Sequence, residues 1–205
     1  MKRLAILGAG GHGKVVADTA ESCGWQSIEF FDDDWPSRAE NGAWAIKGDM
    51  SLLLSKVAEF DGVIVAIGSN SVRLSKSDEL EKAGARLATL VHPSATVSSR
   101  ATIGAGSVVF AGAVVNIDAR IGRGAILNTG CSIDHDCQLA GFTHISPGAR
   151  LAGGVLVGDL SWVGTGAIVI QSIRIGKEVI VGAGAAVIRD VADSLTVVGV
   201  PAKAL

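Results

Sequence analysis

The sequence predicts two domains: a small α/β domain over residues 1–91 and an all-β solenoid domain over residues 92–205. In the first part, short apolar runs alternate with helix-like segments, which is typical of a parallel sheet covered by helices. In the second part, an aliphatic residue recurs at every sixth position, a period that neither a helix nor simple strand alternation produces. The boundary is expected at His92-Pro93-Ser94, because proline stops the preceding pattern.

The expected elements of the first domain follow one another as strand and helix, in the order of a small Rossmann-like sheet. Pro36, Asn41 and Gly42 indicate a loop over residues 35–44. Strands are expected over residues 4–7, 28–31, 62–67 and 86–91, and helices over residues 14–23, 51–58 and 71–83.

The second domain is defined by sixteen hexads whose leading residue is always Leu, Ile or Val, from Val97 to Val187. Four residues after each stands a second register of mostly small side chains, which includes Cys131 and Cys137. Each hexad is interpreted as one short strand plus a corner, with the aliphatic residue pointing into a narrow interior and glycine permitting unusual backbone at corners. Both cysteines are therefore expected in the core rather than as nucleophiles.

Composition excludes several classes of protein. The 205 residues are 48% hydrophobic, with 27 Gly, 5 Phe, 4 Trp and no Tyr, so the core must use small and branched side chains. A net charge of −2 offers no basic surface for nucleic acid. No apolar run is long enough for a membrane-spanning helix, and the N-terminus does not resemble a signal peptide. Three cysteines without metal-ligand spacing favour a cytoplasmic location over a disulfide framework.

A glycine-rich turn, Gly8-Ala9-Gly10-Gly11-His12-Gly13, joins the first expected strand to the first expected helix. Such a turn lets backbone N–H groups approach phosphate oxygens at the positive end of a helix. The second strand ends in Asp32-Asp33-Asp34, where a carboxylate can hold a ribose hydroxyl or a base edge. Because too few strands precede the repeat for two mononucleotide halves, a nucleotide-sugar is favoured over a dinucleotide. A purely structural turn, with His12 as a helix-start residue, is the remaining alternative.

The polar exceptions of the repeat lie in residues 128–137, around His135. His135 stands two places after Ile133 and is expected on the outer surface, where a neutral imidazole can take a proton from an attacking amine or hydroxyl. A carboxylate beside the ring would strengthen this base, and both Asp134 and Asp136 flank it. Strand alternation argues against contact between adjacent side chains, whereas a corner would permit it.

The hexad array and the ending Val198-Gly199-Val200-Pro201-Ala202-Lys203 resemble the left-handed parallel β-helix of hexapeptide-repeat acyltransferases. With the glycine-rich turn and the acidic second strand, nearly the full chain resembles the nucleotide-activated 4-amino-sugar N-acetyltransferases and the sialic-acid O-acetyltransferases. The resemblance implies three hexads per coil and a homotrimer with active sites between neighbouring subunits. It also implies acetyl-CoA as cosubstrate, with no metal.

The same resemblance implies roles for individual residues. His135 is the expected general base, supported by Asp136, which is one methylene shorter than the family's usual glutamate. His144 is expected to touch the acetyl or pantetheine part of acetyl-CoA. The remaining implied positions are Gly153 (oxyanion hole), Thr165 and Ala183 (CoA channel), Gly10, Gly11 and His12 (phosphates or sugar), Asp32 and Asp33 (nucleoside), and Gly68 and Asn70 nearby.

The expected activity is therefore direct transfer of acetyl from acetyl-CoA to the C4 amine of a nucleotide-linked, UDP-linked by preference, 4-amino-4,6-dideoxy sugar. O-acetylation of sialic acid or another glycan precursor is the main alternative. A zinc enzyme of the γ-class carbonic anhydrase type would need three histidines, for which His92, His135 and His144 are the candidates. A non-catalytic scaffold would have no use for the polar cluster around His135.

Overall fold

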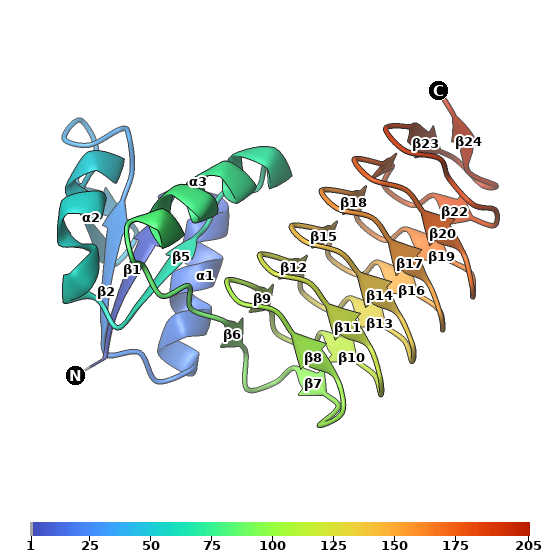
Figure 1. The fold of residues 1–205 in the computed structure, drawn as a ribbon, viewed down its shortest axis with the longest axis horizontal. Coiled ribbons are helices and arrows are strands. Elements are labelled where there is room, and N and C mark those ends of the chain that lie inside the picture. The colour runs from blue at the N-terminus through green and yellow to red at the C-terminus, as the bar shows by residue number, and fades with distance from the viewer. Residues whose placement is uncertain (1) are drawn as a thin grey trace. The chain divides into compact units, whose positions relative to one another are not determined.

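A computed structural model describes residues 2–205, and the division between two compact units follows His92 (Figure 1). The fold is a Rossmann-like α/β unit followed by a left-handed parallel β-helix, which confirms the predicted fold class.

The first unit is a five-stranded sheet in the order β3-β4-β2-β1-β5, with the helices packed around it (Figure 1). Strand β1 pairs in parallel with β2 and β5, and β4 extends the sheet in parallel beside β2. Phe31, Leu53 and Val63 belong to the core between the sheet and its helices. The elements are β1 (Arg3–Leu7), α1 (Gly11–Ser22), β2 (Ser27–Phe31), β3 (Glu40–Asn41), β4 (Trp44–Gly48), α2 (Met50–Lys56), the 3-10 turn η1 (Val57–Glu59), β5 (Gly62–Val65), α3 (Asn70–Lys82) and β6 (Leu90–Val91).

The loop expected over residues 35–44 is present as far as residue 39, but the expectation is wrong for residues 40–44, where β3 and the start of β4 form a hairpin. Gly42 and Ala43 make the turn, and Gly42 has a φ of +69°, a conformation that favours glycine. Likewise, the strand expected over residues 86–91 is reduced to β6, with Leu87 making only an isolated bridge to Val63. Helix α1 begins at Gly11, inside the glycine-rich turn rather than after it.

The second unit is a triangular prism whose three faces are parallel sheets of two-residue strands (Figure 1). Residues eighteen apart pair across neighbouring coils, as Ser132 with Arg150 and Ile133 with Leu151, so three hexads make one coil as predicted. Successive strands occupy faces I, II and III in turn. Face I holds β7 (Thr96–Val97), β10 (Val114–Val115), β13 (Ser132–Ile133), β16 (Arg150–Leu151), β19 (Ile168–Val169) and β22 (Ala186–Val187).

The other two faces are built in the same way. Face II holds β8 (Thr102–Ile103), β11 (Arg120–Ile121), β14 (Gln138–Leu139), β17 (Leu156–Val157) and β20 (Arg174–Ile175). Face III holds β9 (Val108–Val109), β12 (Ile126–Leu127), β15 (His144–Ile145), β18 (Trp162–Val163), β21 (Ile180–Val181) and β23 (Thr196–Val198), with β24 (Lys203–Ala204) antiparallel to β23.

The predicted aliphatic register forms the core of the prism. Val97 and Ile103 are partly buried at its beginning, and the later members of the series are buried. The small register lies beside them, with Cys131 and Cys137 fully buried as predicted. The side chains that face outward are consequently the first residue of each strand and the corner residues, and the chemistry of this unit has to be found among them.

Candidate active site

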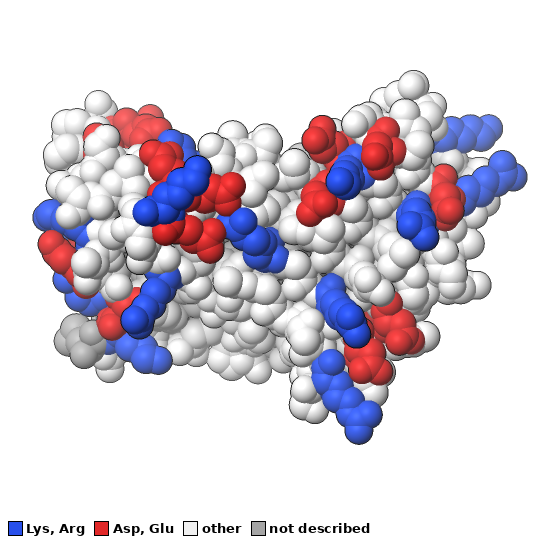
Figure 2. All heavy atoms as spheres, viewed as in Figure 1, with Lys and Arg blue, Asp and Glu red and all other residues white. Residues whose placement is uncertain are grey.

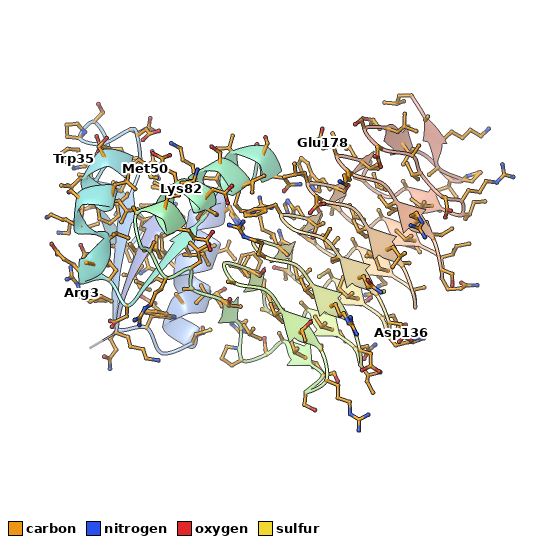
Figure 3. All side chains as sticks on the ribbon, viewed as in Figure 1. Arg3, Trp35, Met50, Lys82, Asp136 and Glu178 are labelled. Atoms are coloured by element: carbon orange, nitrogen blue, oxygen red, sulfur yellow. The ribbon has the colours of Figure 1, made fainter. Side chains whose placement is uncertain are left out.

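His135 lies at the corner between faces I and II, two residues after β13, and its side chain is 57% exposed. Its Nδ1 lies 2.8 Å from Oδ2 of Asp136. Asp136 has a φ of +59°, the left-handed conformation that recurs at the corners of this prism, often at a glycine, and that aspartate tolerates better than most residues. The corner thereby breaks the strand alternation that would separate adjacent side chains. Figure 3 shows Asp136 on the outer rim of the prism.

Asp134, the other candidate partner of the ring, is engaged elsewhere. Its Oδ1 accepts hydrogen bonds from the backbone N–H of His135 at 2.9 Å and from the side-chain amide of Asn116 at 2.8 Å. Asp136 is therefore the carboxylate that contacts the imidazole, in spite of its short side chain. Its hydrogen bond raises the pKa of His135, and the nearby charges of Asp134 and Asp136 add to the shift.

Gly153 stands one coil beyond His135, at the same corner, directly against the imidazole ring. A Cβ placed on Gly153 would lie 2.5 Å from Nε2 of His135, far inside van der Waals contact. The two corners are also joined by a hydrogen bond of 2.9 Å from the N–H of Gly154 to the carbonyl of His135. The absence of a side chain at Gly153 is thus what lets the ring lie this close to the backbone.

His144 occupies a different surface, the outward side of β15 on face III, and is 9% exposed. Trp162, at the paired position of β18, stacks on it with ring centroids 5.3 Å apart and planes within 4°. Nε2 of His144 lies 3.3 Å from the amide nitrogen of Asn128. Trp162 was not predicted as a site residue. The sequence feature that could have identified it is a tryptophan at an outward strand position in a repeat with few aromatic residues. Trp162 is 44% exposed.

Thr165 and Ala183 follow β18 and β21, so they lie one coil apart on the corner between faces III and I. One copy of the chain therefore brings His135, Asp136 and Gly153 together, but places Thr165 and Ala183 on another corner. Face I lies between these two corners. Exposed isoleucines gather toward its C-terminal end, at Ile168, Ile170 and Ile188.

In the first unit, the glycine-rich turn is held to the end of β2 by Asp32. Oδ2 of Asp32 accepts the N–H of Ala9 at 2.5 Å, and Oδ1 accepts the N–H of Asp34 at 3.0 Å. Gly10 is the N-cap of α1 without a side-chain cap, and a Cβ on Gly10 or Gly11 would meet nothing within 4 Å. The start of α1 therefore has open space around it, as an anion site requires.

The second loop of this edge, between β5 and α3, is organised by Arg73, whose side chain is 1% exposed. Its guanidinium donates to the carbonyls of Ile67 and Gly68 at 3.0 and 3.2 Å and to Oδ1 of Asn70 at 2.7 Å. Burial, with a contribution from the charge of Arg73, lowers the pKa of His12 to about 4. Arg73 was missed as a site residue because nothing in the sequence distinguishes a buried arginine from an exposed one on a polar helix.

A small cavity of about 120 Å³ lies at this edge of the sheet. The ends of β1, β2 and β5 meet there with α2 and α3, as expected for ligand sites of parallel sheets. Its lining is Leu7, Gly8, Asp32, Asp33, Met50, Ile67 and Lys76. Asp32 and Asp33 are thus brought to one cavity, and Lys76 joins them without having been predicted.

Among residues 2–205, no three or more His, Cys, Asp and Glu side chains group together in a way that could hold a metal ion. None of the helices in that range is long and apolar enough to cross a membrane.

On the visible surface of the second unit, charged side chains gather in bands with a largely uncharged zone between them (Figure 2).

A hexapeptide-repeat β-helix with a histidine–aspartate pair at one corner, preceded by a Rossmann-like unit, defines the class of hexapeptide-repeat acyltransferases. Residues 3–80 match the family model described as the PglD N-terminal domain. The acetyltransferase domain of PglB from Neisseria gonorrhoeae FA1090, solved in complex with acetyl coenzyme A, is 43% identical. The match covers 100% of this chain and 99% of that chain, with a TM-score of 0.96.

Two other relatives agree with this match. A mutant of perosamine N-acetyltransferase from Caulobacter crescentus, in complex with CoA and GDP-perosamine, is 40% identical over 100% of this chain and 97% of that chain, with a TM-score of 0.94. UDP-N-acetylbacillosamine N-acetyltransferase of Bacillus subtilis (strain 168) is 41% identical over 113 residues, which are 54% of this chain and about half, 52%, of that relative's length. The chain belongs to this family of nucleotide-amino-sugar N-acetyltransferases.

Proposed function

We propose that this protein transfers acetyl from acetyl-CoA to the C4 amine of a nucleotide-linked 4-amino-4,6-dideoxy sugar. The observation that carries the proposal is the His135–Asp136 pair, lying over Gly153 on a fold whose relatives are solved with acetyl-CoA or CoA. Such a pair supplies a base of raised pKa at an exposed corner, which is what deprotonation of an attacking amine requires.

In this mechanism, His135 acts through Nε2. The Nδ1–H donates to Asp136, which leaves the lone pair on Nε2 to take a proton from the amine as its nitrogen attacks the acetyl carbonyl carbon. The carbonyl π electrons move to oxygen and return as the C–S bond breaks, so that CoA departs as a thiolate. The proton held by His135 then passes to that thiolate, and no covalent acyl-enzyme forms.

The acetyl-CoA residues are assigned along the two corners. The N–H of Gly153 donates to no other group of residues 2–205, and we assign it to the developing oxyanion beside the base. We assign Thr165 and Ala183 to the CoA channel. His144 is assigned to the acetyl or pantetheine part, with Trp162 as the aromatic wall of that contact.

The nucleotide-sugar is assigned to the carboxyl edge of the first unit. Its phosphates or sugar would meet the start of α1 at Gly10, Gly11 and His12. Gly68, on the loop that Arg73 holds, and Asn70, the first residue of α3, lie at the same edge. Asp33 would read the nucleoside, while Asp32, whose oxygens accept two backbone N–H groups, contributes mainly by holding the turn.

A homotrimer with active sites between subunits is part of the proposal. The corner with His135 and Gly153 and the corner with Thr165 and Ala183 border face I on opposite sides, so a complete acetyl-CoA site calls for corners from two copies. The isoleucines exposed on face I offer an apolar surface for such packing. The test is mass determination in solution, and a monomer with full activity would contradict it.

UDP is the proposed nucleotide, in keeping with the name of the Bacillus subtilis relative, although the Caulobacter crescentus relative is solved with GDP-perosamine. A cytoplasmic location, which suits the free thiols of Cys23, Cys131 and Cys137, and a role in glycan biosynthesis complete the proposal.

The decisive experiment offers acetyl-CoA with UDP-, dTDP- and GDP-linked 4-amino sugars, and with free and CMP-linked sialic acid, while CoA release and product mass are followed. We expect one acetyl group on the UDP-linked amino sugar. His135→Ala should lower kcat by about 10²- to 10⁴-fold and leave acetyl-CoA binding largely intact. Acetylation of sialic acid in place of the amino sugars would establish the O-acetyltransferase alternative, and near-normal turnover of His135→Ala would remove His135 as the base.

A further inference from the structure

We infer that Lys76 and Asp33 together read the edge of the nucleobase, and that they select a base presenting a carbonyl next to a ring N–H. This inference rests on the proposed function, since it concerns the nucleotide of the same substrate. It adds Lys76 as a specificity-determining residue and names the chemical class of base that the site accepts.

Both charged groups line the same 120 Å³ cavity, but they come from different elements. Asp33 follows the end of β2 and is exposed, whereas Lys76 stands in the second turn of α3. Met50 and Ile67 add apolar surface to the lining of the same cavity, which suits the faces of a flat ring. Opposite charges beside apolar surface suit a planar polar ring, because the charged groups can contact its edge and the apolar side chains can contact its faces.

The neighbouring charged groups are committed elsewhere. Asp32 has each of its oxygens bonded to a backbone N–H of the turns. Arg73, one helical turn before Lys76, is buried and holds the loop after β5. Within residues 2–205 the only polar contact of the Lys76 ammonium is with Glu79, at 3.4 Å and three residues further along the helix, and such surface pairs are worth little. Lys76 and Asp33 are therefore the groups of this cavity that can turn to a ligand at small cost.

Their hydrogen-bonding roles are fixed by charge. A lysine ammonium has three donors and no acceptor, and an ionised carboxylate has acceptors only. Uracil and thymine present carbonyl, N–H and carbonyl in sequence, and guanine presents a carbonyl next to an N–H. Each therefore offers an acceptor to Lys76 and a donor to Asp33. Cytosine and adenine, seated in the same position, would turn an amino group toward Lys76 and an unprotonated ring nitrogen toward Asp33, so donor would face donor and acceptor would face acceptor.

UDP and CDP form the sharpest test, because their rings have the same size and differ only at this edge. Binding of both to the full-length chain is measured by calorimetry, with the pair GDP and ADP as an independent repeat. Wild type should bind UDP more tightly than CDP. Lys76→Met should weaken UDP binding by about 10- to 100-fold, the range for a lost hydrogen bond to a charged group, with little effect on CDP.

Asp33→Asn adds a reversal that simple damage would not produce. An asparagine amide can donate as well as accept, so this variant should weaken UDP binding and bring CDP closer to it. The control is Lys82→Met, at the last residue of α3 and outside the cavity (Figure 3). An unchanged acetyl-CoA affinity and melting temperature identify a folded variant.

The outcomes separate the two levels of the proposal. If wild type binds UDP and CDP with equal affinity, or if Lys76→Met loses the same affinity for both, Lys76 and Asp33 do not select the base. The assignment of a nucleotide site to this edge is unaffected by that result. Failure of wild type to bind any of the four nucleotides overturns the nucleotide-sugar assignment itself, and this inference with it.

Discussion

Gly153→Ala is the substitution whose effect follows most directly from the geometry. The new Cβ would lie 2.5 Å from Nε2 of His135, whereas non-bonded carbon contacts settle at about 3.5 Å or more, so the ring must retreat by about 1 Å. A misplacement of that size at a reacting group costs about 10²-fold in rate. The variant keeps its backbone N–H, so the loss would report the position of the base rather than the loss of an oxyanion donor.

Stability should hardly change in this variant. The ring of His135 is exposed and can swing toward solvent, and the added methyl group slightly restricts the unfolded chain. Gly141→Ala is a matched control, because Gly141 holds the same place in its hexad and its Cβ would meet ordinary contacts of 3.4 Å or longer. Steady-state kcat and the melting temperature are measured for both. Wild-type kcat in Gly153→Ala would refute the placement of the ring over Gly153.

Two further predictions concern titration. Because the hydrogen bond to Asp136 raises the pKa of His135, Asp136→Asn should lower that pKa and move the acid limb of the kcat/KM profile to lower pH, with a slower plateau from the weaker base. If the acid limb of the kcat/KM profile stays at the same pH in Asp136→Asn, Asp136 does not raise the pKa of His135. His12 has a pKa of about 4 in the folded chain against 6.5 ordinarily, so the unfolded chain binds more protons between these values, and stability should fall as pH drops through that window, by at most about 3 kcal/mol. His12→Gln should flatten this slope in thermal denaturation curves, and an identical slope would show that His12 is not its source.

The repeat made the second unit predictable in detail. A strict six-residue period points the leading aliphatic side chain of each hexad inward, and the register four residues later put Cys131 and Cys137 in the core. The first unit is less regular, and the hairpin around Gly42 and Ala43 was not predicted, because β3 is a two-residue polar strand beside a glycine, a pattern typical of a loop.

Candidate site residues were predicted where the groups involved are close together in the sequence. They were missed where only the packing of distant segments brings the groups together. His135 was singled out by the polar residues near it in the sequence, over residues 128–137, but contact between its ring and Asp136 depends on a positive φ at the corner, which the residue type does not reveal. Arg73 and Lys76 stand three residues apart on one helix. Whether such a cation is buried in a loop or lines a cavity depends on packing that no local pattern encodes.

The triangular prism gives the chain two different units of length. Removing six residues between His135 and Thr165 would leave the aliphatic series in phase and the interior filled, but every later side chain would rotate back by one face. Thr165 would then stand at the corner between faces II and III instead of the corner between faces III and I. Only steps of eighteen residues restore both phases. The prism should therefore still fold after an insertion or deletion of six residues. Its functional side chains keep their corners only when the insertion or deletion is a whole coil of eighteen residues.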